Sequence, residues 1–79
     1  MYYIYILKSQ STGKLYKGQT TNLAGRLKQH NSGKTKSTKN GAPWKIVYTE
    51  IYTTLEEVLK REKYLKSAAG RRFIKTIRM

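Results

Sequence analysis

Cysteine and aspartate are both missing from this chain of 79 residues, and its only acidic side chains are four glutamates. Without cysteine there are no disulfides and no cysteine-based zinc site, which fits a reducing compartment and predicts a cytoplasmic protein. Without aspartate a Ser/His/Asp triad is excluded, although a triad with glutamate is not. Two-metal nuclease sites need several carboxylates and are disfavoured, whereas one Mg²⁺ held by a single glutamate, waters and substrate phosphate is compatible with the sequence.

Long hydrophobic runs are absent as well. The apolar start of the chain, residues 1–7, is too short to cross a membrane, and no small-residue cleavage site follows it. The sequence also contains no glycine-rich P-loop. These observations predict a single soluble domain over residues 1–79, whose core must be compact because so short a chain buries little surface.

Positive charge is what the sequence has in excess. Seventeen lysines and arginines face four glutamates, giving a formal net charge of +13. Such an excess destabilises the folded chain by self-repulsion, so a polyanionic partner is expected, and nucleic acid fits best. An anionic membrane is the weaker alternative because no strongly amphipathic helix with a large aromatic face is present. Composition taken alone favours a basic protein that binds RNA without any chemistry.

The order of apolar and polar segments predicts an α+β fold, a three-stranded antiparallel sheet flanked by helices in the order ββαβαα. Strands are expected at residues 2–8, 14–19 and 44–52, and helices at about 23–31, from 53 or 54 to about 67, and at 71–79 after a break at 68–70. Residues 31–43 contain small polar side chains and lysines, which predicts a mobile basic loop.

The strands carry several aromatic residues whose pairing can be anticipated. If Lys8 and Gly13 flank the first hairpin loop, Tyr5 falls opposite Tyr16 on one face of the sheet. Gly18 interrupts the second strand, and glycine inside a strand often marks close approach by a ligand or another backbone. In the third strand, simple alternation places four residues on one face: Trp44, Ile46, Tyr48 and Glu50.

Glu62 is the acid whose position calls for an explanation. Helical spacing puts it on the apolar stripe formed by Leu55, Val58, Leu59 and Leu65. An unpaired carboxylate there is costly, so either an internal ion pair or a functional role is expected, and periodicity leaves both open.

Arg26 and His30 lie one turn apart on the first predicted helix, with His30 almost in line with Leu23. An arginine in this place can hold a phosphate with its planar fork. Taken alone, however, the pair is better explained as a partly buried histidine beside a surface arginine.

Together these residues resemble the GIY-YIG nuclease domain family, and within it the small single-domain bacterial proteins of the UPF0213 type. The corresponding positions are Tyr3-Ile4-Tyr5 for the first motif, Tyr16-Lys17-Gly18 for the second, Arg26 and His30 on the following helix, and Glu62 on a later one. Two features depart from the family pattern. Tyr3 replaces the first glycine, and residues 63–79 contain no asparagine to support the glutamate.

The resemblance implies hydrolysis of DNA phosphodiester bonds with selectivity for structure rather than sequence, and one Mg²⁺ or Mn²⁺ ion bound by Glu62. It implies that Tyr5 or Tyr16 is the general base and the other orients it, with His30, Arg26 and Lys17 favouring the phenolate. Arg26 would also stabilise charge on the phosphate in the transition state. It places the protein in the bacterial cytosol or nucleoid, with other repair or recombination proteins as candidate partners.

Nucleic-acid contacts are predicted at seven residues, most of them basic: Lys17, Gly18, Lys34, Lys36, Lys39, Arg71 and Arg72. Two other functions stay open at this stage. One is a non-catalytic nucleic-acid-binding module on the same fold, and the other is an RNA-associated basic protein.

Overall fold

The computed structural model describes residues 1–77, including every side chain except that of Ser37. Its elements are β1 (Tyr2–Ser9), β2 (Leu15–Thr20), α1 (Leu23–Asn31), the 3₁₀-helix η1 (Lys36–Gly41), β3 (Trp44–Tyr52), α2 (Leu55–Leu65) and α3 (Ala68–Lys75). The predicted α+β fold with the order ββαβαα is therefore confirmed, and η1 is added between α1 and β3. No helix within the described residues is long and apolar enough to cross a membrane.

The three strands form an antiparallel sheet in the order β2-β1-β3, so that β1 is central and β2 is an edge strand. Tyr5 pairs with Gly18 and Leu7 pairs with Tyr16. The predicted pairing of Tyr5 with Tyr16 is wrong by two residues. The two tyrosines nevertheless share a face of the sheet, because an even shift leaves every side chain on its original side.

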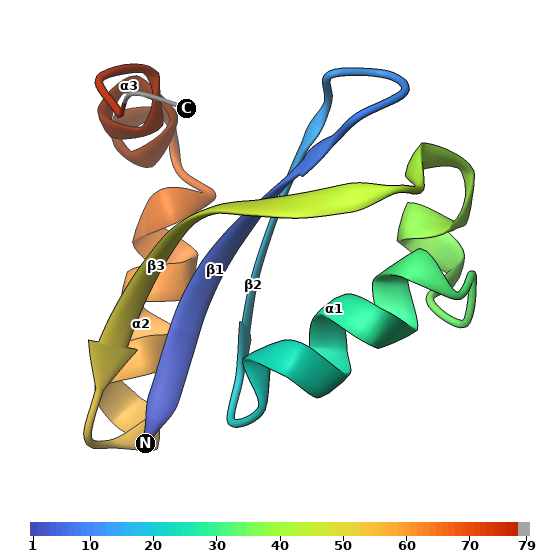
Figure 1. The fold of residues 1–79 in the computed structure, drawn as a ribbon. Coiled ribbons are helices and arrows are strands. Elements are labelled where there is room, and N and C mark those ends of the chain that lie inside the picture. The colour runs from blue at the N-terminus through green and yellow to red at the C-terminus, as the bar shows by residue number, and fades with distance from the viewer. Residues whose placement is uncertain (78–79) are drawn as a thin grey trace.

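Each face of β1 contributes to a different core cluster. Ile4 and Ile6 pack with Val58, Leu65 and Ile74 of α2 and α3. On the other face, Tyr5 and Leu7 pack with Trp44, and residues of α1 lie against them. The sheet thus separates α2 and α3 from α1, an arrangement visible in Figure 1.

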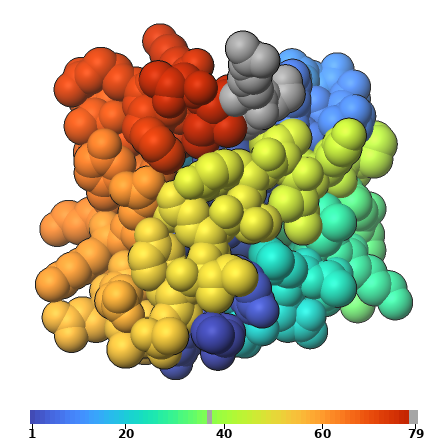
Figure 2. Space-filling view, turned by 60° about the vertical axis from the view of Figure 1, so that its left-hand side comes forward, coloured from blue at the N-terminus to red at the C-terminus, as the bar shows by residue number. Residues whose placement is uncertain are grey.

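β3 contributes to both clusters because its pairing with β1 is irregular. The register shifts between Ile6, which pairs with Tyr48, and Leu7, which pairs with Ile46, so Val47 is the additional residue. Such a bulge reverses the alternation of side chains beyond it. The prediction of one shared face is therefore wrong, since Ile46 joins the α1 side and Tyr48 the α2 side. In the space-filling view, β3 crosses the molecular face between the orange and red helices and teal α1 (Figure 2).

The segment predicted as a mobile basic loop contains a packed element. η1 occupies residues 36–41, and Thr38 within it is 1% exposed. The indole nitrogen of Trp44 donates a hydrogen bond to the carbonyl oxygen of Thr38 at 2.8 Å, and the side chain of Asn31 bonds the backbone of Trp44. Polar groups rather than apolar side chains therefore hold this part of the segment in place.

α1 and α2 begin close to the residues that the sequence predicts, each after a capping side chain. Asn22 caps α1 by accepting a hydrogen bond from Gly25 N, and Thr54 caps α2 by accepting one from Glu57 N. Ser67 caps α3 in the same way, so residues 68–70 form its first turn rather than the predicted break. In α2, Val58 and Leu65 are buried but Leu55 and Leu59 are exposed, so the apolar stripe is narrower than predicted.

Candidate functional site

Tyr5 lies at the centre of a polar cluster on the α1 side of the sheet. Its side chain is 2% exposed, and its Oη lies 3.1 Å from His30 Nε2. Arg26 donates a hydrogen bond from Nε to the same Oη at 3.3 Å. His30 and Arg26 both come from α1, where a spacing of four residues places them on one side of the helix. The phenol of Tyr5 is therefore held by two groups that bind its oxygen.

His30 is fully buried and is held from its other side by η1. Its Nδ1 lies 2.7 Å from Thr38 Oγ1, and the Thr38 hydroxyl donates to the carbonyl oxygen of Thr35 at 3.3 Å. We assign the Thr38 proton to that bond, so that Thr38 Oγ1 accepts from His30 Nδ1–H. His30 Nε2 then carries no proton and accepts from the Tyr5 hydroxyl. Burial, reinforced by the charge of Arg26, lowers the pKa of His30, which keeps this acceptor neutral at pH 7.

The pKa of Tyr5 is set by opposing effects. Burial raises it, and the charges of Tyr16 and Glu62 act in the same direction. The hydrogen bond and positive charge of Arg26 oppose this rise without cancelling it. Tyr5 is thus neutral at pH 7 and donates its proton towards a neutral histidine.

Tyr16 covers the cluster as an aromatic lid. Its ring lies 4.9 Å from the ring of His30, 6.4 Å from that of Tyr5 and 6.5 Å from that of Trp44, measured between centroids. Tyr16 is half-buried, whereas Tyr5 beneath it is almost completely enclosed. Of the two tyrosines, Tyr16 is therefore the one more open to solvent.

Gly18 makes room for the phenol of Tyr5. A Cβ atom at this position would lie 2.5 Å from Tyr5 Oη, closer than real Cβ contacts come. The sequence suggests a ligand or another backbone as the close neighbour of this glycine, whereas the structure shows the side chain of Tyr5 there. Gly18 is buried, and the absence of a side chain there lets Tyr5 lie flat over β2 and reach His30.

Glu62 approaches from the opposite side of the sheet. It lies on α2, its side chain is 23% exposed, and its carboxylate pairs with Lys66 Nζ at 3.5 Å. The ion pair expected for a half-buried acid is therefore present, with a partner one turn along the same helix. Glu62 is near enough for its charge to act on Tyr5, but none of the hydrogen bonds of the described residues connects it to the other four site residues.

The predicted nucleic-acid contacts occupy two regions. Lys34, Lys36 and Lys39 are exposed on and beside η1, close in sequence to Thr38. Lys17, Arg71 and Arg72 lie on the other side of the sheet, with Lys17 half-buried on β2 and both arginines exposed on α3. Basic side chains thus lie on both sides of the sheet.

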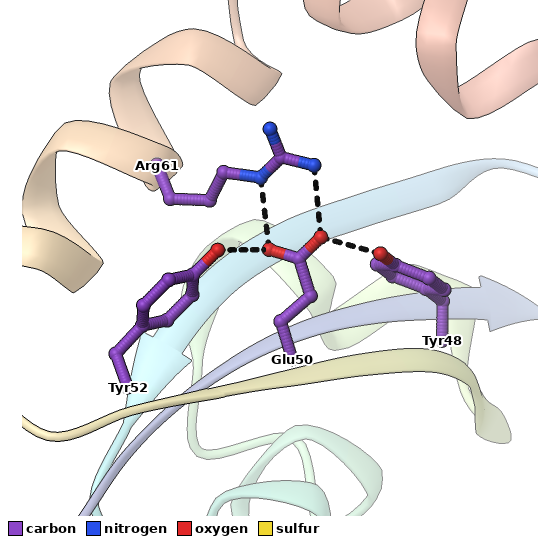
Figure 3. Close-up of polar contacts among 4 residues, drawn as sticks. All are labelled: Tyr48, Glu50, Tyr52 and Arg61. Atoms are coloured by element: carbon purple, nitrogen blue, oxygen red, sulfur yellow. Dashed lines mark hydrogen bonds and ion pairs between the residues drawn. The ribbon is translucent and has the colours of Figure 1, made fainter.

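A second polar cluster joins β3 to α2, the helix that carries Glu62. Arg61 donates two hydrogen bonds of 2.9 Å to the two carboxylate oxygens of Glu50. The hydroxyls of Tyr48 and Tyr52 also donate to Glu50, as Figure 3 shows. The Arg61 guanidinium lies 4.9 Å from the ring centres of both Tyr64 and Phe73. This cluster fixes α2 against the sheet and so determines where Glu62 lies.

Four contributors to these clusters are not indicated by the sequence alone. Thr38 lies in a polar segment without any pattern, so its contact with His30 has no sequence signal. Trp44 was assigned to a strand but not to the site. Glu50 and Arg61 are 11 residues apart, and only the pairing of β3 with α2 brings them together.

Removal of the Thr38 hydroxyl tests the assigned proton positions. Thr38→Val should deprive His30 Nδ1–H of its acceptor and let the other neutral tautomer, protonated at Nε2, become populated. Because the chain has one histidine, its ¹⁵N chemical shifts report the tautomer without overlap. The expected wild-type spectrum is that of the Nδ1–H form at pH 7.

A matched control is available in the same segment. Thr35→Val removes a hydroxyl that makes no capping hydrogen bond, so the His30 spectrum should stay as in the wild type. A wild-type spectrum of the Nε2–H form, or equal spectra for all three proteins, would contradict the assigned chain of hydrogen bonds.

The fold and this cluster define a class of small α+β domains in which a strand hairpin and the helix after it present two tyrosines, an arginine and a histidine. The profile described as "GIY-YIG catalytic domain" matches residues 1–75. The chain therefore belongs to the GIY-YIG domain family. Membership of this family suggests that the chain is related to nucleases.

Relatives of known sequence and structure agree with this assignment. The chain is 47% identical over 66 residues to a UPF0213 protein of Syntrophus aciditrophicus, covering 81% of this chain and 75% of that protein. It is 36% identical over 77 residues to a UPF0213 protein of Staphylococcus haemolyticus, covering 96% and 93%. The solution NMR structure of a UPF0213 protein from Bacillus halodurans matches with a TM-score of 0.58 and 32% identity, covering 99% of this chain and 86% of that one.

Proposed function

We propose that this protein is an endonuclease that hydrolyses DNA phosphodiester bonds, selects DNA structure rather than sequence, and uses one Mg²⁺ or Mn²⁺ ion. The observation that carries the proposal is the hydrogen-bonded chain from Arg26 through Tyr5 to His30, covered by Tyr16. These hydrogen bonds connect Arg26, a cation that can bind phosphate, to the proton donor Tyr5 and the neutral proton acceptor His30. Phosphodiester hydrolysis needs groups of these kinds.

In the proposed mechanism Tyr16, as the more exposed tyrosine, first releases its hydroxyl proton to solvent, and the resulting phenolate takes the proton from the attacking water. Tyr5 orients it, and His30 holds Tyr5 through Nε2. The Arg26 guanidinium binds the phosphate through its donors that Tyr5 does not use, and stabilises the charge that develops there. Net positive charge of +13 draws the DNA to the protein and makes binding sensitive to salt.

The donor chemistry at Glu62 fits a single hard cation. Its carboxylate is partly exposed, so waters and a substrate phosphate can complete the coordination, as Mg²⁺ commonly requires. Within the described residues no three His, Asp or Glu side chains come together, so Glu62 would be the protein ligand. A bound ion would neutralise charge on the phosphate, and Lys66 would have to release Glu62 for the ion to bind.

A nicking assay tests the proposal. Purified protein is incubated with supercoiled, branched and single-stranded DNA, with Mg²⁺, with Mn²⁺ and with a chelator. Cleavage of branched DNA in Mg²⁺, and none in chelator, is the expected result. Tyr16→Phe should slow cleavage more than Tyr3→Phe. The second variant is a control, because Tyr3 takes no part in the polar cluster.

The alternative is a nucleic-acid-binding module without catalysis on the same fold. The ion pair of Glu62 with Lys66 favours it, since this pair occupies the carboxylate that a metal needs. Salt-sensitive DNA binding with no nicking at any metal concentration would support this alternative and contradict the proposal that the protein is an endonuclease. Preference for RNA over DNA in competition would instead identify an RNA-associated protein.

A further inference from the structure

A cleft lies between the edge strand β2 and the C-terminal helix α3, on the side of the sheet away from Tyr5. Its volume is about 210 Å³. Three cationic and two aliphatic side chains line it: Leu15, Lys17, Arg71, Ile74 and Lys75. Arg71 and Lys75 are four residues apart and therefore lie on one face of α3, turned towards β2. The fold thus brings together Lys17 and Arg71, which are 54 residues apart in sequence.

The charges in this cleft repel one another. Burial lowers the pKa of Lys17, and the positive charges of Arg71 and Lys66 lower it further. Among the described residues, the ion pairs involve neither Lys17, Arg71 nor Lys75. Glu62, which lies on the same side of the sheet, pairs with Lys66 rather than with any of these three cations. A half-buried lysine beside two other cations is costly, and an anion bound between them would relieve the repulsion.

We infer that the cleft between β2 and α3 binds a backbone phosphate of the nucleic-acid strand, held by Lys17 and Arg71. Arginine supplies a planar fork that matches phosphate oxygens, and lysine adds a point charge. Leu15, which is 37% exposed, and Ile74 provide an apolar wall against which a sugar can pack. The inference rests on the proposed function in one respect, that the partner is nucleic acid.

The position of the cleft gives the bound strand a path. Lys17 directly follows Tyr16 in β2, and successive side chains in a strand point to opposite faces. Lys17 therefore faces α3 while Tyr16 faces α1, with the exposed edge of β2 between them. The charge of Lys66, which pairs with Glu62, acts on Lys17, so the cleft lies near the acid proposed to hold the metal. A strand crossing the edge of β2 would contact the cleft and the polar cluster together.

Arg71 and Arg72 are both predicted from the sequence to contact nucleic acid, but the inference keeps this role for Arg71 and withdraws it for Arg72. Arg71 lines the cleft, whereas its neighbour Arg72 does not, although both are exposed on the same helix. Arg72→Ala therefore removes the same charge from the same helix without touching the cleft. It is a matched control for Arg71→Ala, because a general loss of positive charge would weaken binding equally in both variants.

The test measures binding of a fluorescent single-stranded DNA oligonucleotide over a series of salt concentrations. Arg71→Ala should weaken binding roughly tenfold at low salt and reduce the slope of log K against log salt by about one. Lys17→Gln, which keeps the aliphatic stem, should behave similarly. The double variant should reduce the slope by no more than about one, because both side chains contact one phosphate. Arg72→Ala should change affinity by less than about twofold.

Equal effects of Arg71→Ala and Arg72→Ala, with both variants folded by circular dichroism, would overturn the inference. So would saturation of the wild-type cleft by inorganic phosphate that the oligonucleotide does not displace, since the ligand would then be the free anion. The nicking assay separates the two proposals. If the wild type nicks DNA but the two arginine variants bind alike, the cleft assignment alone fails. If the wild type never nicks but Arg71→Ala selectively loses binding, the enzyme proposal alone fails.

Discussion

Replacement of Glu62 by glutamine is expected to reduce the rate of DNA cleavage by about 10²–10³-fold or more, the loss typical of removing one preorganised electrostatic group from an active site. The glutamine keeps the size of the side chain and its oxygen but loses the negative charge that a divalent cation requires. DNA affinity should stay within about twofold of the wild type, because phosphate is bound by lysines and arginines and not by Glu62. Single-turnover nicking and a binding titration measure the two quantities separately.

Glu56→Gln is the matched control for this experiment. Glu56 lies on the same helix, is largely exposed and pairs with Lys60 one turn away, much as Glu62 pairs with Lys66. The substitution changes net charge equally but is six residues from the proposed metal ligand. Nicking by Glu62→Gln at the rate of Glu56→Gln would exclude Glu62 as the metal ligand, whatever the activity of the wild type.

Replacement of Glu50 by alanine is expected to lower the free energy of unfolding by about 2–3 kcal/mol, somewhat less than for a fully buried pair. The substitution leaves the Arg61 guanidinium without its carboxylate and the hydroxyls of Tyr48 and Tyr52 without their acceptor. The side chains of Arg61 and Glu50 are 27% and 14% exposed, so water reaches the ions only in part. Urea denaturation measures the loss, which is large against the roughly 5–15 kcal/mol stability of a typical domain.

The exposed pair of Glu56 with Lys60 supplies the comparison for stability as well. Both side chains are more than three-quarters exposed, at 79% and 77%, so Glu56→Ala should cost less than about 1 kcal/mol. Similar losses for Glu50→Ala and Glu56→Ala would show that the cluster in Figure 3 does not stabilise the attachment of α2.

The dependence of stability on pH follows from the same cluster. Burial alone would raise the pKa of Glu50, but hydrogen bonds from Arg61, Tyr48 and Tyr52 outweigh it and leave the pKa below its ordinary value. A carboxyl group whose pKa is lowered in the folded state stabilises the fold above its unfolded pKa of about 4.3. That contribution is lost as the pH falls through the folded pKa. Glu50→Ala should therefore lose less stability on acidification than the wild type does.

Some contacts of the fold and of the site could be predicted from the sequence, and others could not. The spacing of Arg26 and His30 predicts that they share a helix face. Tyr5 and Tyr16 share a face of the sheet even though the predicted pairing is two residues off, because a shift by an even number of residues keeps each side chain on its side. Thr38 was not predictable as a partner of His30, because polar contacts in an irregular segment leave no periodic pattern. The bulge at Val47 was equally hidden, since an extra residue changes the facing of a strand without changing its composition.

The sequence alone determined the α+β class, the order of elements, the approximate starts of α1 and α2, and the net charge of +13, because periodicity, capping chemistry and charge are local properties. Tertiary structure alone decided that His30 is held between Tyr5 and Thr38, that Glu50 binds Arg61, and that Arg71 but not Arg72 lines the cleft beside Lys17. These contacts join residues far apart in the chain, and their geometry depends on register, on a bulge and on the packing of helices on both faces of one small sheet.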